Sequence, residues 1–364
     1  MKLIKIIIVS LICLLPFSLR AMDHSKPLML SDKYYKEYWE QHFLFEDGTF
    51  ITSQFLVANF PWPVGRDHGI MISTVVSPDG KRAIIKNGRN LGKWGFDSGK
   101  FNLFIHTHRL KSEGRQHDIH VGTVGRSVVD ITGKASIPPL DHQPYKTKKD
   151  YMKSSFYLPY FEGDGKWSIQ YDGKKSFVTG KGKVQGFGTH AIFNGRVEGL
   201  LKSWLRISGL TSFKDDEEQT TLIPFLSSME RPDGRQDNIL TLKNADNDVI
   251  VFSDITVSYK DIVKASKKSS YPTVIEITAK NDTASLTGTI HFTRKIDHFN
   301  IMDHLNFFER TFAKSRASVA NYRYIADYDL SYVTSEGTQK LTGKALSEYK
   351  DILPPKKKKK KRRK

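Results

Sequence analysis

The sequence predicts an all-β protein whose strands are joined mainly by tight antiparallel hairpins. Short runs of alternating apolar and polar residues recur along the chain, and Asp-Gly dipeptides separate many of them. Alternation with period two buries one face of a strand, and Asp-Gly accepts the positive φ of a two-residue hairpin turn. The clearest example is residues 43–51. We therefore expect sheets that close into barrels. The dipeptides begin at Asp47, Asp79, Asp164, Asp172 and Asp233.

Length and composition allow two domains with well-filled cores. The chain has 364 residues, of which 38% are hydrophobic and 12% aromatic. Residues 1–21 predict a secretory signal, because basic Lys2 and Lys5 precede an apolar run that ends near the small residue Ala21. We expect cleavage after Ala21 and a secreted or periplasmic protein. Bulky Leu19 leaves an uncleaved anchor as the alternative.

Cysteine usage excludes several kinds of chemistry. Cys13 is the only cysteine, and it lies within the apolar run of the predicted signal. The mature chain would therefore contain no thiol. This excludes disulfides, a cysteine nucleophile, an iron-sulfur cluster and a cysteine-based zinc site.

The positive charge is concentrated at the ends of the chain. The formal net charge is +18; the run from Lys356 to Lys364 contributes nine charges and Lys2, Lys5 and Arg20 contribute three, which leaves +6 for the body. Residues 354–364 predict a disordered polybasic tail, because two prolines precede a run of like charges. The tail is either a solvated end or a contact with an anionic membrane surface. No stacked aromatic and basic pattern accompanies it, so nucleic acid is not favoured as a partner.

The first half of the chain is predicted to be mostly strands. Residues 31–41 predict a short helix with Ser31 as its N-cap, and residues 134–160 predict a long irregular excursion rich in proline. Glycine-rich residues 180–199 keep an apolar pattern, and acidic residues 215–218 mark a domain boundary near 211–220. The predicted strands are residues 50–57, 70–76, 101–108, 117–124 and a segment that begins at Trp167.

The second half of the chain is also predicted to be mostly strands, with one helix. Ile301, Leu305, Phe308 and Phe312 have helical spacing, so residues 297–314 predict an amphipathic helix docked on a sheet. The predicted strands are residues 238–243, 249–259, 273–279, 285–292 and 322–334.

Histidines suggest a metal site that the surrounding residues do not complete. His106 and His108 would lie on one face of a strand, with His117 and His120 on the next. No carboxylate stands at a fixed spacing to join them, so we expect histidines at a barrel mouth or surface and no metal. Glycines 180, 182, 186 and 188 lack the spacing of a phosphate loop, and more often mark a bend or a close backbone approach. We expect no cofactor. A Gly-x-Ser-x-Gly serine-hydrolase elbow is also missing from the sequence.

One loop resembles the mouth of a pocket. Trp62 lies between two prolines and just before Arg66 and His68, and a loop tryptophan beside charged groups suits a ligand site. Trp94 adds a second aromatic candidate.

Three segments resemble the lipocalin-like proteins that include the fungal survival-factor family. Residues 43–50 with 54–59 resemble the opening hairpin, residues 188–199 the crossing between two barrels, and residues 341–349 the closing strand. The superfamily also contains carotenoid hydratases, fungal Diels-Alderases and AttH-like bacterial proteins. The resemblance implies two barrels, an apolar ligand, and a position near the domain interface for His190, Phe193 and Arg196. Asn194-Gly195 departs from the family's usual Trp-Pro, and no catalytic residue is carried over.

We therefore predict an all-β protein of two lipocalin-like barrels in tandem, with a few short helices. The predicted domains are residues 31–215 and 216–353. We expect a carrier or binder of a lipid or another hydrophobic molecule. The candidate ligand-binding residues are Trp62, Arg66, His68, Trp94, His106, His108, His190, Phe193 and Arg196.

Two alternatives use the same sequence features. The first is an enzyme on this scaffold, a hydratase, cyclase or pericyclase acting on an isoprenoid or polyene. It would need a buried carboxylate among Asp67, Asp97, Asp118 and Glu198. The second is a structural envelope protein with filled barrels and no small ligand.

Overall fold

The computed structural model describes most of the chain between His24 and Pro355. The described residues are 24, 26–59, 65–89, 92–97, 101–122, 125–148, 150–171, 176–213, 222–266, 269–300, 303 and 318–355. The predicted signal, Trp62, the acidic residues 215–218 and the basic run 356–364 lie outside them. Among the residues that the structure describes, no helix has the length and apolar character needed to cross a membrane.

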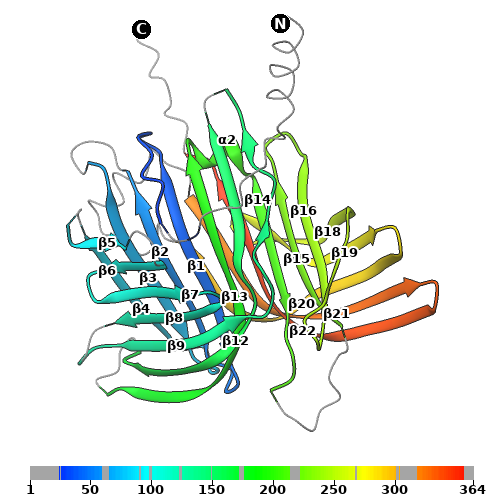
Figure 1. The fold of residues 1–364 in the computed structure, drawn as a ribbon, viewed down its shortest axis with the longest axis horizontal. Coiled ribbons are helices and arrows are strands. Elements are labelled where there is room, and N and C mark those ends of the chain that lie inside the picture. Colours follow the sequence, from blue (N-terminus) through cyan, green and yellow to red (C-terminus); the bar gives the residue numbers. More distant parts are fainter. Residues whose placement is uncertain are drawn as a thin grey trace, which may run out of the picture.

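Two curled antiparallel sheets form the molecule (Figure 1), which confirms the predicted all-β class. Within the described residues, the first sheet has 13 strands in the order β4-β3-β2-β1-β13-β12-β9-β8-β7-β6-β5, with β10 and β11 paired to β12. Its strands are β1 (Lys36–Phe45), β2 (Phe50–Ala58), β3 (His68–Val76), β4 (Arg82–Arg89), β5 (Trp94–Phe96), β6 (Phe101–Ile105), β7 (His108–Glu113), β8 (Gln116–Gly122), β9 (Val128–Ala135), β10 (Leu140–Asp141), β11 (Tyr145–Lys146), β12 (Tyr151–Ile169) and β13 (Val178–Asn194).

The second sheet has nine strands in the order β17-β16-β15-β14-β22-β21-β20-β19-β18. A short helix, α2 (Val197–Leu200), connects the sheets. The strands are β14 (Ser203–Gly209), β15 (Leu222–Glu230), β16 (Gln236–Asn244), β17 (Val249–Val251), β18 (Asp254–Lys264), β19 (Ser270–Lys280), β20 (Ala284–Asn300), β21 (Ser318–Thr334) and β22 (Gly337–Leu353).

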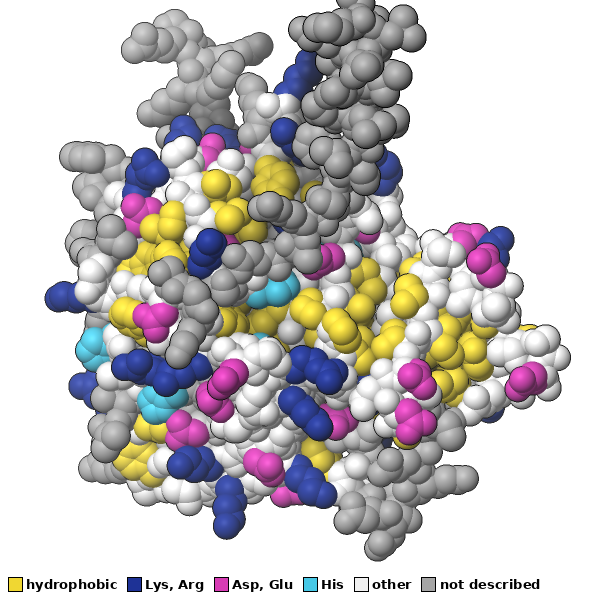
Figure 2. Space-filling model, in the orientation of Figure 1, with side chains coloured by type: hydrophobic (Ala, Val, Ile, Leu, Met, Phe, Trp, Pro, Cys, Tyr) yellow, Lys and Arg dark blue, Asp and Glu magenta, His cyan; other side chains and the backbone are white. Residues whose placement is uncertain are grey.

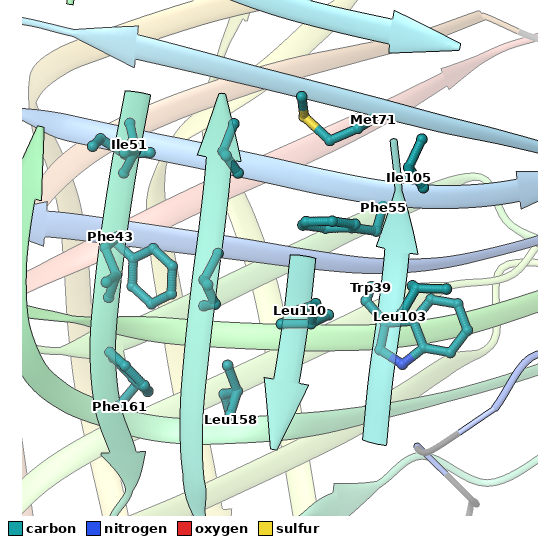
Figure 3. Packing of buried hydrophobic residues seen from close by; sticks show 14 of the residues in the cluster. Trp39, Phe43, Ile51, Phe55, Met71, Leu103, Ile105, Leu110, Leu158 and Phe161 are labelled. Carbon is teal, nitrogen blue, oxygen red and sulfur yellow. The ribbon is translucent and has the colours of Figure 1, made fainter. Parts of the chain in front are cut away.

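Side chains connect strands that are not neighbours in the sheet orders, as expected where a sheet curls toward closure. Asn87 of β4 lies 3.1 Å from the Nε2 of His108 on β7. In the second sheet, Gln236 and Asn238 of β16 donate to main-chain carbonyls of Val257 and Ile255 on β18, at 3.1 and 2.9 Å. Each curled sheet encloses its own apolar core, and Figure 3 shows that of the first.

A third apolar cluster joins the outer faces of the two sheets. It includes Phe156 and Phe187 from the first sheet and Trp204, Phe225 and Leu346 from the second. The sheets therefore pack face to face, and β12 and β13 of the first sheet contribute to this cluster together with β14, β15 and β22 of the second. Basic and acidic side chains are interspersed on the surface over the first sheet (Figure 2), in keeping with the modest charge of the body.

The predicted helix over residues 31–41 is wrong, because this segment enters β1. Alternate residues point to opposite sides: Trp39 and Phe43 lie in the first-barrel core, whereas Tyr38 and Leu44 lie in the cluster between the sheets. Both faces of β1 are buried, so apolar and aromatic residues occupy both. This removes the simple alternation by which a half-exposed strand is recognised.

The beginning of the second predicted helix is also wrong. β20 continues to Asn300, so residues 297–300 are extended, and most of residues 301–314 lie outside the described part of the chain. Residues 101–108 are two strands rather than one, because His106 and Thr107 form the turn between β6 and β7.

The predicted irregular excursion over residues 134–160 also contains strand. β12 begins at Tyr151 and shifts register between Ser155 and Phe161 around Pro159. Proline has no N–H for a ladder bond, and a bulge lets the strand continue past it.

The sheets change over between Asn194 and Ser203. The acidic segment that the sequence predicts as the domain boundary instead connects β14 to β15, which are paired within the second sheet.

Candidate functional site

The inward face of β1 brings polar groups into the first-barrel core. Glu37, Trp39, Gln41 and Phe43 alternate with residues that face the second sheet. Glu37 and Gln41 are fully buried among aromatic side chains. Buried polar groups need partners, and those partners define the site.

Glu37 forms a close pair with His190 of β13. The two strands are neighbours and place Trp39 opposite His190. The Oε1 of Glu37 lies 2.8 Å from the Nε2 of His190, and both side chains have 0% exposure. The Trp39 ring stacks on the imidazole, with ring centres 4.2 Å apart and planes inclined by 16°. Trp39 therefore fixes the plane of the imidazole, and Glu37 fixes its rotation.

The second oxygen of Glu37 is also held. Its Oε2 accepts the hydroxyl of Tyr35 and the main-chain N–H of Leu28, the latter at 2.7 Å. Burial and the nearby Glu37 carboxylate raise the pKa of Tyr35, so this phenol remains a hydrogen-bond donor. Because these donors suit a carboxylate, we assign Glu37 as ionised and the proton of His190 to Nε2.

A second polar group lies in the same core. Gln41 donates to the hydroxyl of Tyr157 and accepts from Ser53 at 2.6 Å. The ring of His117 lies 5.7 Å from that of Tyr157. Burial lowers the pKa of His117 to about 4, so its imidazole is neutral at ordinary pH. Its Nδ1 has no hydrogen-bond partner among the described residues.

These groups can transfer protons within an apolar space. A neutral imidazole that donates Nε2–H to a carboxylate keeps a basic lone pair on Nδ1. If that nitrogen takes a proton, Glu37 stabilises the resulting imidazolium, as the carboxylate does in a Ser-His-Asp triad. The arrangement is therefore suited to general acid–base chemistry.

Of the nine predicted ligand-binding residues, His190 is the one that the structure brings into this pair. Trp62 lies outside the described residues, and Arg66 and His106 are exposed. His108 is buried, but its Nδ1 accepts the main-chain N–H of Gly122 at 2.8 Å, away from the Glu37–His190 pair.

The remaining candidates also lie away from the pair. His68 begins β3, and Trp94 donates to the Asp67 carbonyl at 2.8 Å. Phe193 stacks on Tyr38 between the sheets. Arg196 is exposed and donates to the hydroxyl of Tyr34.

The enzyme alternative requires a buried carboxylate, and Glu37 is one. The sequence analysis proposed four other residues for this role. Asp97 and Asp118 are exposed, whereas Asp67 and Glu198 are partly exposed. Glu37 was missed because its segment was predicted to be a helix. An extended reading of β1 would have aligned Glu37 with Trp39, Gln41 and Phe43 on one face.

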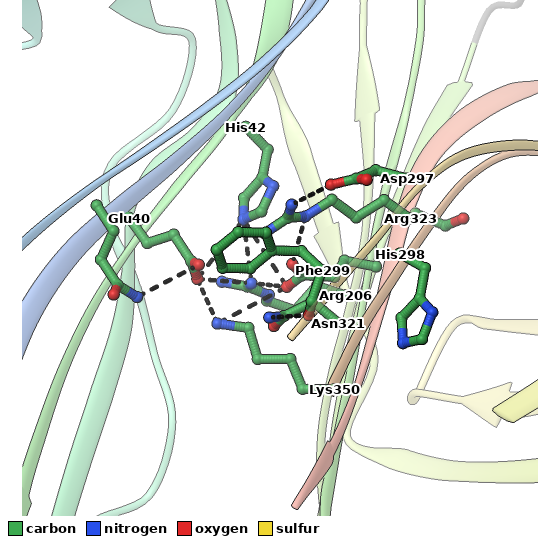
Figure 4. Close-up of polar contacts among 12 residues, drawn as sticks. Glu40, His42, Arg206, Asp297, His298, Phe299, Asn321, Arg323 and Lys350 are labelled. Carbon is green, nitrogen blue, oxygen red and sulfur yellow. Dashed lines mark hydrogen bonds and ion pairs between the residues drawn. The ribbon is translucent and has the colours of Figure 1, made fainter. Parts of the chain in front are cut away.

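A second buried polar cluster lies between the sheets (Figure 4). Arg206 of β14 donates to the carboxylates of Glu40 and Glu348 and, at 2.9 Å, to the hydroxyl of Thr189. Arg323 joins Glu348 to Asp297 at 2.9 and 3.0 Å. We call Glu40, His42, Arg206, Asp297, Arg323, Glu348 and Lys350 the interface network.

Charge balance explains how the interface network is tolerated inside the protein. Burial alone would raise the pKa of Glu40, but Lys350 and Arg206 outweigh it and hold that pKa well below its ordinary value. Burial, assisted by Arg206, lowers the pKa of Lys350 to about 7. Burial also keeps the pKa of His42 well below its ordinary value.

The interface network contains a group with metal-ligand spacing, formed by Glu40, His42 and Glu348. Arg206 already contacts all three side chains. A divalent cation would meet this guanidinium, so the group favours an ion-pair network over a metal site.

A Ser-His-Asp arrangement also lies between the sheets. The Oγ of Ser227 is 2.9 Å from the Nε2 of His142, and the Nδ1 of that ring is 3.3 Å from Asp237. Ser227 has 0% exposure and accepts the indole N–H of Trp204 at 2.8 Å. The hydroxyl of Ser227 is enclosed in the contact between the sheets. We therefore interpret Ser227, His142 and Asp237 as a structural contact that stabilises the packing of the two sheets.

Known structures with this fold cover nearly the whole chain, although no family model and no curated protein matches the sequence. An AttH-type protein from Nitrosomonas europaea has 10% identity and a TM-score of 0.56, covering 92% of this chain and 98% of that one. Kievitone hydratase from Nectria haematococca has 10% identity and a TM-score of 0.50, covering 91% of each chain. CghA has 10% identity and a TM-score of 0.59, covering 93% of this chain and 94% of its own. At such low identity the likeness concerns the fold, and it confirms the predicted tandem lipocalin-like architecture.

Proposed function

We propose that this chain, which has the tandem lipocalin-like fold, is an enzyme that performs acid–base chemistry on a hydrophobic substrate in its first barrel. The observation that carries the proposal is the fully buried Glu37–His190 pair, with 2.8 Å between its nearest atoms. The surrounding core is rich in aromatic side chains, including Trp39, Phe101 and Tyr157.

The cost of burying this pair supports a functional role. Removing a carboxylate from water costs several kcal/mol, and apolar residues of similar volume are often as stabilising as a buried ionic pair. The first barrel already has an apolar core in which such residues would pack. A buried titratable group with a specific charge partner is a candidate for a functional site, so the pair favours catalysis over carriage.

The proposed chemistry is a proton transfer that neither oxidises nor reduces the substrate. The Nδ1 of His190 would take a proton from the substrate, or from the water molecule that adds to it, while Glu37 stabilises the positive charge on the ring. The same nitrogen would then return a proton to another atom of the substrate or its intermediate. Addition or loss of water and isomerising ring closure both fit this scheme, and neither needs a redox cofactor. The name of kievitone hydratase, one of the proteins that share the fold, supports the hydratase class.

The proposal retains the hydrophobic ligand of the carrier hypothesis and adds chemistry to it. To test it, the purified chain and its Glu37→Gln and His190→Gln variants would be incubated with an apolar extract of the native host and followed by mass spectrometry. We expect the wild type to convert a compound to an isomer or to a product that differs by one water. Each variant should convert it roughly 10² to 10⁴ times more slowly, the usual contribution of a general acid or base.

Exposed His291, replaced by alanine, provides the control that should retain full activity. Equal conversion by wild type, Glu37→Gln and His190→Gln would contradict the proposal. A compound that copurifies with the protein and is changed by none of them would indicate a carrier instead.

The compartment and the membrane partner are proposals that rest on sequence alone. Residues 1–21 support a periplasmic or secreted enzyme, and the run from Lys356 to Lys364 supports attraction to anionic membrane surfaces. An apolar substrate that partitions into membranes would suit both.

A further inference from the structure

A short N-terminal segment lies against the Glu37–His190 pair. We call His24 with residues 26–30 the N-terminal strap. Its Leu28 N–H donates to Glu37 at 2.7 Å, its Met29 N–H contacts the hydroxyl of Tyr35 at 3.1 Å, and its His24 carbonyl accepts the Trp39 indole N–H at 3.0 Å. The N-terminal strap therefore uses main-chain atoms to contact three residues of the site.

The side chain of His24 contacts the nitrogen of His190 that the proposed chemistry uses. The two Nδ1 atoms lie 3.0 Å apart, and the ring centres are separated by 5.3 Å. Because His190 donates through Nε2 to Glu37, its Nδ1 is an acceptor, and the proton between the rings belongs to His24. His24 thus presents a planar ring with an N–H donor to the catalytic base.

The position of His24 indicates what else would fit there. Its ring centre lies 5.9 Å from that of Tyr157, so a flat ring at this place has an aromatic neighbour as well as a hydrogen-bond acceptor. The opposite nitrogen of His24 lies 3.5 Å from the hydroxyl of Ser155. A phenol or an enol combines a planar apolar body with a weakly acidic O–H, and it would make the same hydrogen bond to His190.

His24 and a substrate cannot both donate a hydrogen bond to the Nδ1 of His190. The Nδ1 of His190 has one lone pair, which accepts one donor. His24 contacts the site through hydrogen bonds and through ring contacts with His190 and Tyr157, whereas Met29 and Leu30 pack against the first apolar core. Hydrogen bonds of this kind contribute little net free energy, so a ligand with comparable contacts can replace His24.

We propose that His24 occupies the substrate's proton-donor subsite, and that the substrate is a planar phenol or enol that displaces His24 and donates its hydroxyl to His190. This inference rests on the proposed function, because it names the substrate class of the same site. It predicts that the strap competes with the ligand and lowers the ligand's apparent affinity.

Binding of 2-naphthol, a fluorescent planar phenol, tests the proposal without any turnover. The matched probe is 2-methoxynaphthalene, which has the same ring system without the acidic proton. Removal of the competing bond in His24→Ala should tighten 2-naphthol binding by roughly 2- to 12-fold, which corresponds to about 0.5–1.5 kcal/mol. Binding of 2-methoxynaphthalene should change less, and His190→Phe should abolish the preference for 2-naphthol over it.

A second variant loosens the strap without altering His24. Leu28→Pro removes the N–H that donates to Glu37, and it should tighten 2-naphthol binding in the same direction. Added 4-methylimidazole should compete with 2-naphthol more effectively in His24→Ala than in the wild type, because it refills the space of the missing ring. His291→Ala is the control with unchanged binding.

Unchanged or weaker 2-naphthol binding in both strap variants would overturn the proposal. Equal tightening of 2-naphthol and 2-methoxynaphthalene binding would also overturn it. The higher affinity would then come from the volume freed by the missing ring and not from a hydrogen bond to the Nδ1 of His190. A different result would contradict the enzymatic function alone. In that case Glu37→Gln and His190→Gln would retain full conversion, while the strap variants would still tighten 2-naphthol binding.

Discussion

At the level of single residues, the first barrel combines neutral and ionised groups in one apolar interior. His117 illustrates the cost of this combination. Its imidazole is surrounded by Phe101 and Tyr157, and burial lowers its pKa to about 4. His190 avoids isolation because Glu37 and His24 hold both of its nitrogens.

His117 should make the stability of the protein depend on pH. Its unfolded pKa is about 6.5, so between pH 6.5 and 4 the unfolded chain binds more protons at this residue than the folded chain. Stability is therefore lost as the pH falls through this range, by an amount on the order of 3 kcal/mol for this group. We expect urea unfolding of His117→Phe to show a smaller loss between pH 7 and 4 than the wild type. Parallel curves for the two proteins would contradict the assignment, and exposed His291→Ala should follow the wild type.

At the level of elements, β13 shows why glycine is needed in a long central strand. Gly186 pairs with Phe43 on β1 and with Phe161 on β12. A Cβ at Gly186 would lie 1.8 Å from the main-chain oxygen of His42. The expectation that a strand glycine marks a close backbone approach is confirmed at this position.

Gly186→Ala should therefore destabilise the first barrel. The added carbon would meet backbone that cannot rotate away, and overpacking of this kind costs about 1–3 kcal/mol or more. The free energy of unfolding, measured with urea, should fall by about 1–3 kcal/mol or more. Gly88→Ala on β4 is the matched control, since the nearest atom to its new Cβ is a side-chain carbon of Ile70 at 4.0 Å. Equal stability of Gly186→Ala and Gly88→Ala would show that β1 and β13 are not held this closely.

At the level of the whole molecule, the interface network joins the two sheets through buried charges. Glu40 and His42 come from the first sheet, whereas Arg206, Arg323 and Glu348 come from the second. Such a network needs every member, because each remaining charge would otherwise be buried without compensation. Relative placement of the two barrels therefore depends on charge matching as well as on the apolar cluster around it.

Replacement of Arg206 should expose this dependence. Arg206→Met removes a cation that contacts both Glu40 and Glu348, leaves one excess negative charge in the buried network, and should cost about 3–5 kcal/mol in the free energy of unfolding. Further replacement of Glu40 alone by glutamine should recover part of the loss, since the remaining charges of the network then balance again. Lys340→Met is the surface control: its pair with Asp329 is exposed and should contribute no more than about 1 kcal/mol. If Arg206→Met lowers the free energy of unfolding as little as Lys340→Met does, the interface network does not stabilise the packing of the two sheets.

The sequence by itself determined the class of fold and one member of the candidate site. Asp-Gly turns and alternating residues are local signals, so they predicted hairpins such as β1–β2 around Asp47-Gly48. The resemblance added the tandem barrels and singled out His190. These features depend on residues that are close together in the chain.

Only the tertiary structure decided that His190 lies beside Glu37, which is 153 positions away in the sequence. Pairing of β1 with β13 is a long-range choice, and no local period specifies which strand becomes the neighbour. Burial of both faces of β1 also concealed its alternation, so Glu37 was assigned to a helix. The site arose from a cross-strand contact and from the approach of His24, and both depend on how distant segments pack.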